Sequence, residues 1–300
     1  MAEKREKNIK ELRLNTLAGG CATAFGVGLF NPLDTLRIRW QTLNSANVNG
    51  AANSTLFGFT KSTIQKEGLV RGLWLPGCAA HMGAVFISSG IRLGFYPTIR
   101  DIFAGDNRKN AFHMWLAGFT AGAFGFFVSN PLFQLKVRMQ ATTGHQNKPY
   151  SSSFDCLYKI AKGEGLRGLY RGATTLMARG AMLSAGAQLG YDYTKTELKS
   201  LGVLVDGPAL HVISSVASAF LATTFCAPFD LIMTKYQSGP VLGIHYNSVF
   251  DCSRKIFQTN GLLGFYRGWS PLFMRICPLF AVNIPLYEQV RKLFGLTYLD

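Results

Sequence analysis

Opposite charges stand three residues apart inside an apolar stretch near the N-terminus. The stretch LAGGCATAFGVGLF leads into NPLDTLRIRWQ at 31–41, where Asp34 and Arg37 share one helix face. A charged side chain in an apolar helix is costly unless it is paired or hydrated, and by default it marks a functional site. The chemistry that such residues offer is the making and breaking of ion pairs between neighbouring helices.

Two arginines in later apolar stretches offer a second chemistry. Arg179 and Arg275 each follow a glycine, Gly172 or Gly268, by seven residues, and neither has a carboxylate one turn away on its own helix. A guanidinium stays charged and binds a carboxylate or phosphate through two parallel hydrogen bonds. Two such groups predict a site for a small dianion; the alternative is that both arginines only hold helices together.

The composition indicates that these residues lie on membrane helices. The 300-residue chain is 48% hydrophobic and 16% charged, and it contains 32 glycines, which is typical of helices packed closely in lipid. Its net charge is +15, but the basic residues are spread along the chain without a basic stripe or zinc-ligand spacing. We therefore expect anionic lipid and anionic solutes as partners, with no nucleic acid and no metal. The six cysteines form no CxxC pair and are predicted to be reduced.

The proline motif occurs three times. NPLDTLRIRWQ returns as NPLFQLKVRMQ at 130–140 and as APFDLIMTKYQ at 227–237, at nearly equal intervals of roughly 100 residues. Other markers follow each copy in the same order, such as YPTIR, YDYTK and YEQVR near the end of each unit. We assign three repeats within one transmembrane domain, at residues 1–108, 109–206 and 207–300.

Each repeat reads as an apolar helix ending in the proline motif, a polar loop, a short amphipathic helix and a second apolar helix. The late proline is expected to kink the first helix of each repeat. Six spans place both termini on the same side of the membrane. The stretches long enough to cross a bilayer are 14–40, 78–100, 112–140, 174–198, 209–237 and 270–293.

Three copies of P-x-[DE]-x-x-[KR]-x-[KR]-x-Q, an aromatic-basic-Gly segment and [FY]-[DE]-x-x-[KR] resemble the mitochondrial carrier family over essentially the whole chain. The resemblance implies an all-α membrane protein of six transmembrane helices and three short matrix helices in three pseudo-symmetric repeats. It implies alternating-access transport across the mitochondrial inner membrane. No GxSxG, metal-ligand cluster or GxxxxGK[ST] is present, so we do not expect an enzyme. We expect a monomer.

The departures from the proline motif indicate which helices pair around the bundle axis. Phe133 replaces the acid of the second repeat, and Met233 replaces the base of the third. If each acid pairs with the base of the following repeat, both defects fall in one apolar pair and every remaining acid finds a base. The opposite direction leaves charges unpaired, which is costly at this depth. The predicted pairs are Asp34–Lys136, Asp230–Arg37 and the sulfur–aromatic pair Phe133–Met233.

By resemblance, this network is the matrix gate, and the later [FY]-[DE]-x-x-[KR] motif forms the cytoplasmic gate. Glutamines nine residues after each proline match the glutamine braces of the family, and they are expected to hydrogen-bond across the pairs. These braces are Gln41, Gln140 and Gln237. The predicted cytoplasmic gate contains Arg100, Asp192, Lys195, Glu288 and Arg291, whose pairing direction the residues leave open.

By resemblance, the offset of Arg179 and Arg275 coincides with the substrate contact points of the family. An arginine followed by a small residue at the second contact resembles carriers of keto acids and dicarboxylates. RLGFY at 92–96 and the missing third base resemble the oxaloacetate and oxoglutarate branch. Carriers of phosphorylated three-carbon acids and uncoupling-type proton carriers are the alternatives. The predicted substrate-binding residues are Ala84, Val85, Ser88, Arg92, Arg179, Gly180 and Arg275.

His81 precedes Ala84 by one helical turn and has two possible roles. It either hydrogen-bonds a neighbouring carbonyl or carries a proton together with the anion. The residues also leave open whether transport is by exchange or proton symport.

The family also binds cardiolipin where a short matrix helix meets the next span, because free N–H groups at a helix start hold a phosphate. We expect structural cardiolipin and no other cofactor. LPG at 75–77 lacks the base of the motif, so the first site is the least complete. The predicted lipid-binding residues are Gly68, Gly165, Gly261, Arg171, Gly172, Arg267 and Gly268.

Overall fold

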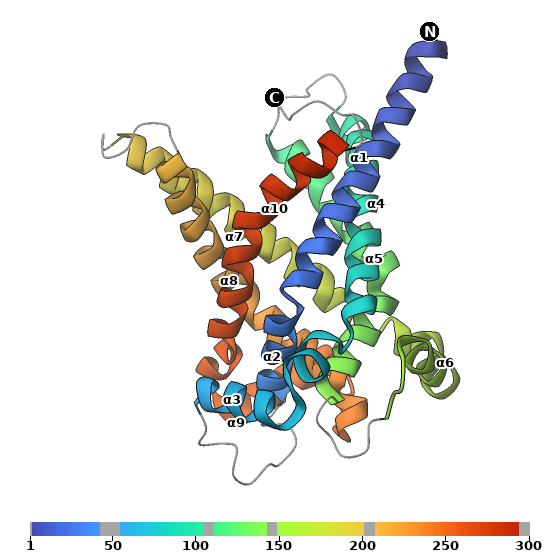
Figure 1. The fold of residues 1–300 in the computed structure, drawn as a ribbon, viewed down its shortest axis with the longest axis vertical. Coiled ribbons are helices and arrows are strands. Elements are labelled where there is room, and N and C mark those ends of the chain that lie inside the picture. The colour runs from blue at the N-terminus through green and yellow to red at the C-terminus, as the bar shows by residue number, and fades with distance from the viewer. Residues whose placement is uncertain (1, 43–54, 105–110, 143–148, 201–207, 294–300) are drawn as a thin grey trace.

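The computed structural model describes residues 2–42, 55–104, 111–142, 149–200 and 208–293, and the secondary structure in these ranges is entirely helical (Figure 1). The long helices are α1 (Ala2–Leu29), which α2 (Asn31–Thr42) continues, α4 (Cys78–Ala104), α5 (Ala111–Thr142), α7 (Ala173–Ser200), α8 (Pro208–Ser238) and α10 (Trp269–Leu293). The short helices are α3 (Leu56–Glu67), α6 (Ser153–Leu169) and α9 (Val249–Asn260). Single turns follow at η2 (Val70–Trp74), η3 (Gly239–Leu242) and η4 (Leu262–Tyr266).

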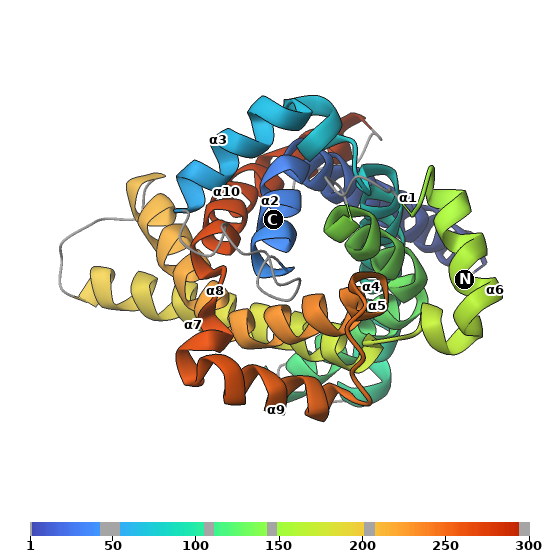
Figure 2. The ribbon, with the colours of Figure 1, turned by 90° about the horizontal axis from the view of Figure 1, so that it is seen from below.

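The helices form a bundle that narrows toward one end. In Figure 1 the long helices diverge toward the upper end, where α1 begins and α10 ends, and converge below. Seen from below, they form a ring with α2 near its centre and with α3, α6 and α9 around its outside (Figure 2). When α1 and α2 are counted together as one span, the structure contains the predicted six spans and three short helices.

Length and apolar composition alone single out two membrane-crossing stretches among the described residues, Leu116–Thr142 and Ile213–Leu242. A third apolar stretch, Thr16–Leu29, ends where α1 ends. The spans with lower hydropathy include α7 and α10, which carry Arg179 and Arg275. Polar side chains that face the bundle axis lower the mean hydropathy of a span without exposing charge to lipid.

The three prolines have different effects on the helices. In the first repeat the helix is interrupted at Phe30, which lies between α1 and α2 and two residues before Pro32. Proline lacks an N–H and its ring crowds the preceding turn, so it favours such a break. Pro131 and Pro228 instead lie inside continuous helices, α5 and α8.

Each short helix begins at a capping residue, and a glycine ends α3 and α9 and interrupts α6. A hydroxyl oxygen accepts a hydrogen bond from the N–H three residues on, which satisfies one of the free N–H groups of the first turn. These N-caps are Thr55, Ser152 and Ser248. The glycines adopt positive φ values that favour glycine over other residues. They are Gly68 (77°), Gly165 (66°), which interrupts α6, and Gly261 (64°).

Two of the short helices are joined to the long helices by bidentate ion pairs. Arg39 of α2 donates to both carboxylate oxygens of Glu67 of α3, at 2.5 and 3.2 Å. Arg138 of α5 likewise donates to both oxygens of Glu164 of α6, at 2.7 Å for the Nη2–Oε2 contact. This fork geometry fixes both the distance and the orientation of the two helices.

The third short helix is held differently. Lys235 occupies the position of the two arginines and is buried, but Asn260 stands where the other repeats have glutamate. Among the described residues, α9 and its connecting segment instead pack on α8 through an apolar cluster. Its members are Leu231, Ile232, Tyr246, Cys252 and Ile256.

Candidate functional site

The first acid of the proline motif lies at the centre of a buried charged network. Asp34 is fully buried, and Lys136 of α5 forms an ion pair with its Oδ2. Arg37 lies 2.9 Å and Arg275 of α10 lies 3.1 Å from its Oδ1. The Nδ1 atom of His81 is 3.6 Å from Oδ2. The predicted contact between Asp34 and Lys136 is therefore present, and three further groups, Arg37, Arg275 and His81, approach the same carboxylate.

The second acid, Asp230 of α8, is also fully buried. Arg37 donates to its Oδ2, which is the contact predicted from the direction of pairing. Gln41 donates to the same oxygen at 3.0 Å and so spans this pair as expected. Arg179 of α7 donates through Nε to Oδ1 at 2.5 Å. Since Arg37 contacts both acids, the two ion pairs form one continuous network.

The third position around the axis is apolar. Phe133 and Met233 belong to one buried cluster together with Ala84 and Leu176. The ring of Phe126 lies 5.9 Å from that of Phe133, measured between centroids. The two residues that depart from the motif are therefore brought together, as the pairing predicted.

Two of the three glutamines do not form the predicted braces. Gln140 donates to Asn31 at 3.1 Å and to the Thr35 hydroxyl at 2.9 Å, so it contacts α2 but not the acid. The carboxylate of Asp34 is already surrounded by cations. Gln237 donates to the carbonyl of Arg171 at 3.2 Å, because the apolar third pair offers it no polar group.

Asparagines before two of the prolines have a role that sequence reasoning missed. Asn31 donates through Nδ2 to the carbonyls of Trp74, at 2.5 Å, and Pro76, at 3.3 Å. Asn130 donates in the same way to the carbonyl of Leu169 at 2.7 Å. These bonds tie the start of each proline motif to the segment before the next long helix. The repeated NP dipeptide at 31 and 130 was the available signal.

The two arginines predicted to bind an anion already have carboxylate partners. Arg179 contacts Asp230 and Arg275 contacts Asp34, and all four side chains are buried. The sequence showed no carboxylate one turn away on the helix of either arginine, and the partners come from other helices. Both acids come from neighbouring helices, α8 and α2, a proximity that spacing along one helix does not reveal.

The remaining predicted substrate residues lie on α4 and α7, and they differ in how far their side chains are exposed. Ala84 is buried in the apolar cluster, and Val85 packs against it. The Ser88 hydroxyl donates to the Val85 carbonyl at 3.3 Å, and Arg92 is exposed. Gly180 is buried beside the ring of Phe126.

The predicted cytoplasmic gate falls largely outside the described residues. Lys195 of α7 is half-buried and has an interaction partner. The helices that carry the gate are described at these positions, but four of the side chains are not, so their pairing stays a prediction. These are Arg100, Asp192, Glu288 and Arg291.

The predicted lipid residues border a groove at the start of α7. It is lined by Arg167, Tyr170, Gly172 and Tyr236 among others, and Gly172 has a φ of 77°. The Arg171 side chain is engaged elsewhere, because it donates to the carbonyls of Tyr236 at 2.8 Å and Tyr246 at 3.1 Å. Both Arg167 and Arg171 line the groove, but the guanidinium of Arg171 is already hydrogen-bonded to these two carbonyls.

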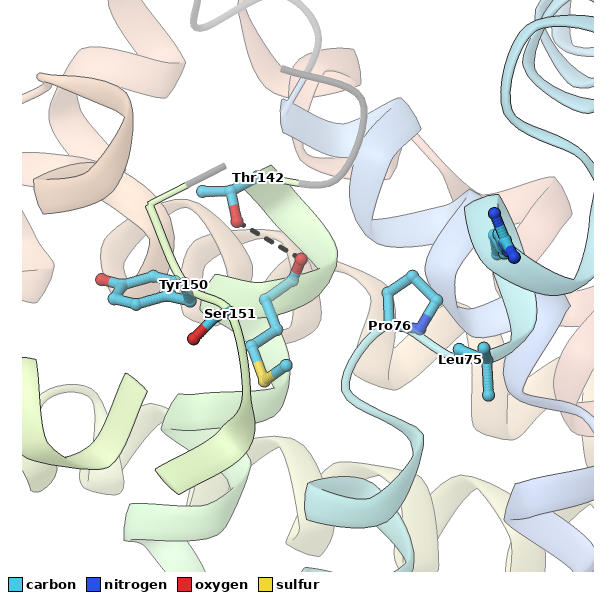
Figure 3. A pocket seen from close by; sticks show the side chains of 7 residues that line it. Leu75, Pro76, Thr142, Tyr150 and Ser151 are labelled. Carbon is cyan, nitrogen blue, oxygen red and sulfur yellow. Dashed lines mark hydrogen bonds between the residues drawn. The ribbon is translucent and has the colours of Figure 1, made fainter. Parts of the chain in front are cut away.

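The other two predicted lipid sites differ from the one at α7. Gly268 has a φ of 86°, and the Arg267 guanidinium lies 5.7 Å from the ring centroid of Trp40. A pocket lies beside the LPG segment, where the base of the motif is missing (Figure 3). An arginine from η2 borders this pocket. The lining residues are Arg71, Leu75, Pro76, Met139, Thr142, Tyr150 and Ser151.

Three helical repeats surround a buried ionic network, an arrangement typical of a membrane carrier of solutes. The sequence model of the family described as "Mitochondrial carrier protein" matches the chain three times, at residues 10–107, 107–201 and 205–297. The chain belongs to the mitochondrial carrier family. It is thus a transporter of the mitochondrial inner membrane.

Curated relatives match nearly the full chain. "Mitochondrial citrate transporter E" of Aspergillus niger is 33% identical, with 92% of each chain covered. "Mitochondrial substrate carrier family protein ucpB" of Dictyostelium discoideum is 29% identical, covering 96% of this chain and 98% of the relative. "Probable mitochondrial 2-oxoglutarate/malate carrier protein" of the same organism is 29% identical, covering 96% and 91%. Two of these names state a substrate, citrate in one and 2-oxoglutarate and malate in the other, and the third states none.

Proposed function

We propose that the protein carries small dianions, keto acids or dicarboxylates such as oxaloacetate, malate and oxoglutarate, by alternating access. The observation that supports this proposal is the charge balance of the buried network. Four bases and two acids contact one another, which leaves two positive charges in excess. The bases are Arg37, Lys136, Arg179 and Arg275, and the acids are Asp34 and Asp230.

A buried charge without a counter-charge is costly, so the excess favours the binding of an anion with two negative charges. Arg179 and Arg275 are the bases that the acids can release, because Asp34 keeps Lys136 and Asp230 keeps Arg37. Each guanidinium can then present its fork to one carboxylate of the solute. The short carbon skeleton between the carboxylates would face the apolar cluster around Ala84.

Binding of the anion also couples the site to the matrix gate. Once Arg179 turns toward the solute, Asp230 loses one of its two arginines, and Asp34 loses Arg275 in the same way. The network that joins α2, α5 and α8 is then weaker, and its separation costs less free energy. An anion that binds both arginines therefore lowers the barrier to opening on the matrix side.

The experiment is an uptake screen with the purified carrier in liposomes, loaded and unloaded with candidate anions. We expect exchange of oxaloacetate, malate or oxoglutarate, and its loss in both Arg179→Gln and Arg275→Gln. Arg254→Gln is the matched control, because this arginine is exposed on α9. Retention of most exchange in Arg179→Gln would show that the site is elsewhere.

The same screen separates two other functions. The guanidinium forks accept phosphate as well as carboxylate, so phosphoenolpyruvate and triose phosphate are included. Proton flux that is activated by fatty acid and inhibited by nucleotide, without exchange of any anion, would identify an uncoupling-type carrier instead.

We also propose that cardiolipin headgroups bind at the starts of α4, α7 and α10. The groove at Gly172 supports this at α7, since helix N-termini attract phosphate and Arg167 adds a positive charge. Beside the LPG segment, Arg71 lines the pocket and would supply the charge that the motif lacks. Cardiolipin should raise the unfolding temperature in detergent, and Arg167→Gln should reduce this effect.

A further inference from the structure

His81 of α4 is buried among groups from three other helices. Its Nδ1 lies 3.2 Å from Asn31 Oδ1 and 3.6 Å from Asp34 Oδ2, both on α2. Its Nε2 lies 3.5 Å from Nη2 of Arg275 on α10. The ring of Phe133 on α5 meets it edge-on, with centroids 6.4 Å apart. The imidazole therefore connects the gate acid to one of the anion-binding arginines.

The hydrogen bonds determine where the imidazole carries its proton. Asn31 donates through Nδ2 to the carbonyls of Trp74 and Pro76, so its Oδ1 is the atom that faces His81. Nδ1 faces two acceptor oxygens, Asn31 Oδ1 and Asp34 Oδ2, and a lone pair on Nδ1 would repel both, which places the hydrogen on Nδ1. In the neutral ring Nε2 then holds a lone pair, and it faces an N–H of Arg275.

Burial of the ring and the cations around it disfavour a second proton in the resting network. Lys136 of α5, Arg37 of α2 and Arg275 of α10 are cations near the ring, against the single carboxylate of Asp34. A proton on Nε2 would add a fourth positive charge and would point at a guanidinium. The resting network therefore holds His81 without a second proton.

We propose that His81 takes up the proton that accompanies the anion, an inference that rests on the proposed function. When the solute draws Arg275 away, Nε2 loses its donor and the added negative charge offsets the nearby cations. Nε2 then accepts one proton from water on the open side, and the ring becomes an imidazolium. Release of the anion on the other side returns Arg275 to Asp34, and the proton leaves Nε2.

The test measures net anion uptake and internal pH together, in liposomes clamped at zero membrane potential. One proton per anion means that a gradient of one pH unit supports about tenfold accumulation of the anion. We expect this in the wild type and in the control His245→Gln, whose side chain is exposed on a loop. His81→Gln keeps a donor and an acceptor but does not titrate. It should accumulate less than about twofold while still exchanging labelled anion for unlabelled anion.

Three results would overturn the inference. In the first, the wild type exchanges anion but shows no proton uptake. In the second, His81→Gln retains the full accumulation and the same pH profile. In the third, His81→Gln has lost exchange, but a second variant, His81→Asn, exchanges anion with its proton coupling intact. Absence of any anion exchange in the wild type is a different result, because it refutes the proposed function itself.

Discussion

Asp230 and Arg179 should contribute unequally to stability, although they form one ion pair. Asp230 accepts hydrogen bonds from Arg179, Arg37 and Gln41, whereas Arg179 has a single carboxylate partner in the described structure. Asp230→Asn leaves the buried guanidinium of Arg179 without an acid, leaves Arg37 with Asp34 alone, and increases the positive excess of the network. Arg179→Gln removes one of the surplus charges and leaves the acid with two donors.

The magnitudes follow from these contacts. Removal of one partner of a buried pair costs about 3–5 kcal/mol. Asp230→Asn should reach this range, since Arg179 loses its acid and Arg37 loses one of its two. Arg179→Gln should cost about 1–2 kcal/mol, the value of one hydrogen bond to a charged group. In the double variant, Arg37 keeps Asp34 and neither of the two guanidinium groups that faced Asp230 is left without an acid. We therefore expect a coupling free energy of about 2 kcal/mol between the two positions.

The assay is thermal unfolding in detergent, followed with a thiol-reactive dye. Cys156, Cys226 and Cys252 are fully buried, so they react when the bundle opens. A coupling of about 2 kcal/mol corresponds to a difference of roughly 4–8 °C between the observed and the additive unfolding temperature of the double variant. Equal losses for the two single variants, or simple additivity in the double variant, would refute the assignment of Arg179 to the gate network.

Two further predictions concern the helix contacts outside the network. The hydrogen bonds from Arg138 lower the pKa of Glu164 below its usual 4.5, so their stabilisation is present above pH 4.5 and is lost as the pH falls through the lowered value. Glu164→Gln should flatten this part of the pH dependence of the unfolding temperature. A Cβ at Gly186 of α7 would lie 2.7 Å from Ala222 Cα of α8, so Gly186→Ala should destabilise the bundle by about 1–3 kcal/mol. Gly163→Ala, where a Cβ meets nothing within 4 Å, should instead leave the unfolding temperature unchanged or raise it.

The sequence was sufficient for the parts of the site that depend on the repeat. The missing acid at Phe133 and the missing base at Met233 selected the direction of pairing, because only one direction leaves no charge unpaired. The contacts of Asp34 with Lys136 and of Asp230 with Arg37 follow from that choice.

The carboxylate partners of the two anion-binding arginines could not be predicted in this way. Arg179 reaches Asp230 and Arg275 reaches Asp34 because of the relative height and tilt of neighbouring helices. Spacing along one helix carries no information about that height. Gln140 was misassigned for a related reason, since its partner depends on which side chains already occupy the space around Asp34.

The unequal attachment of the three short helices makes the three-fold bundle mechanically asymmetric. The carboxylates of Glu67 and Glu164 fix α3 and α6 by directional bonds, so these helices turn only with the long helices that carry the arginines. Asn260 gives α9 no such bond, and the apolar surface beneath it has no preferred direction. In the described structure α9 can therefore shift along α8 without breaking an ion pair between the two helices, whereas α3 and α6 cannot move in this way without breaking theirs.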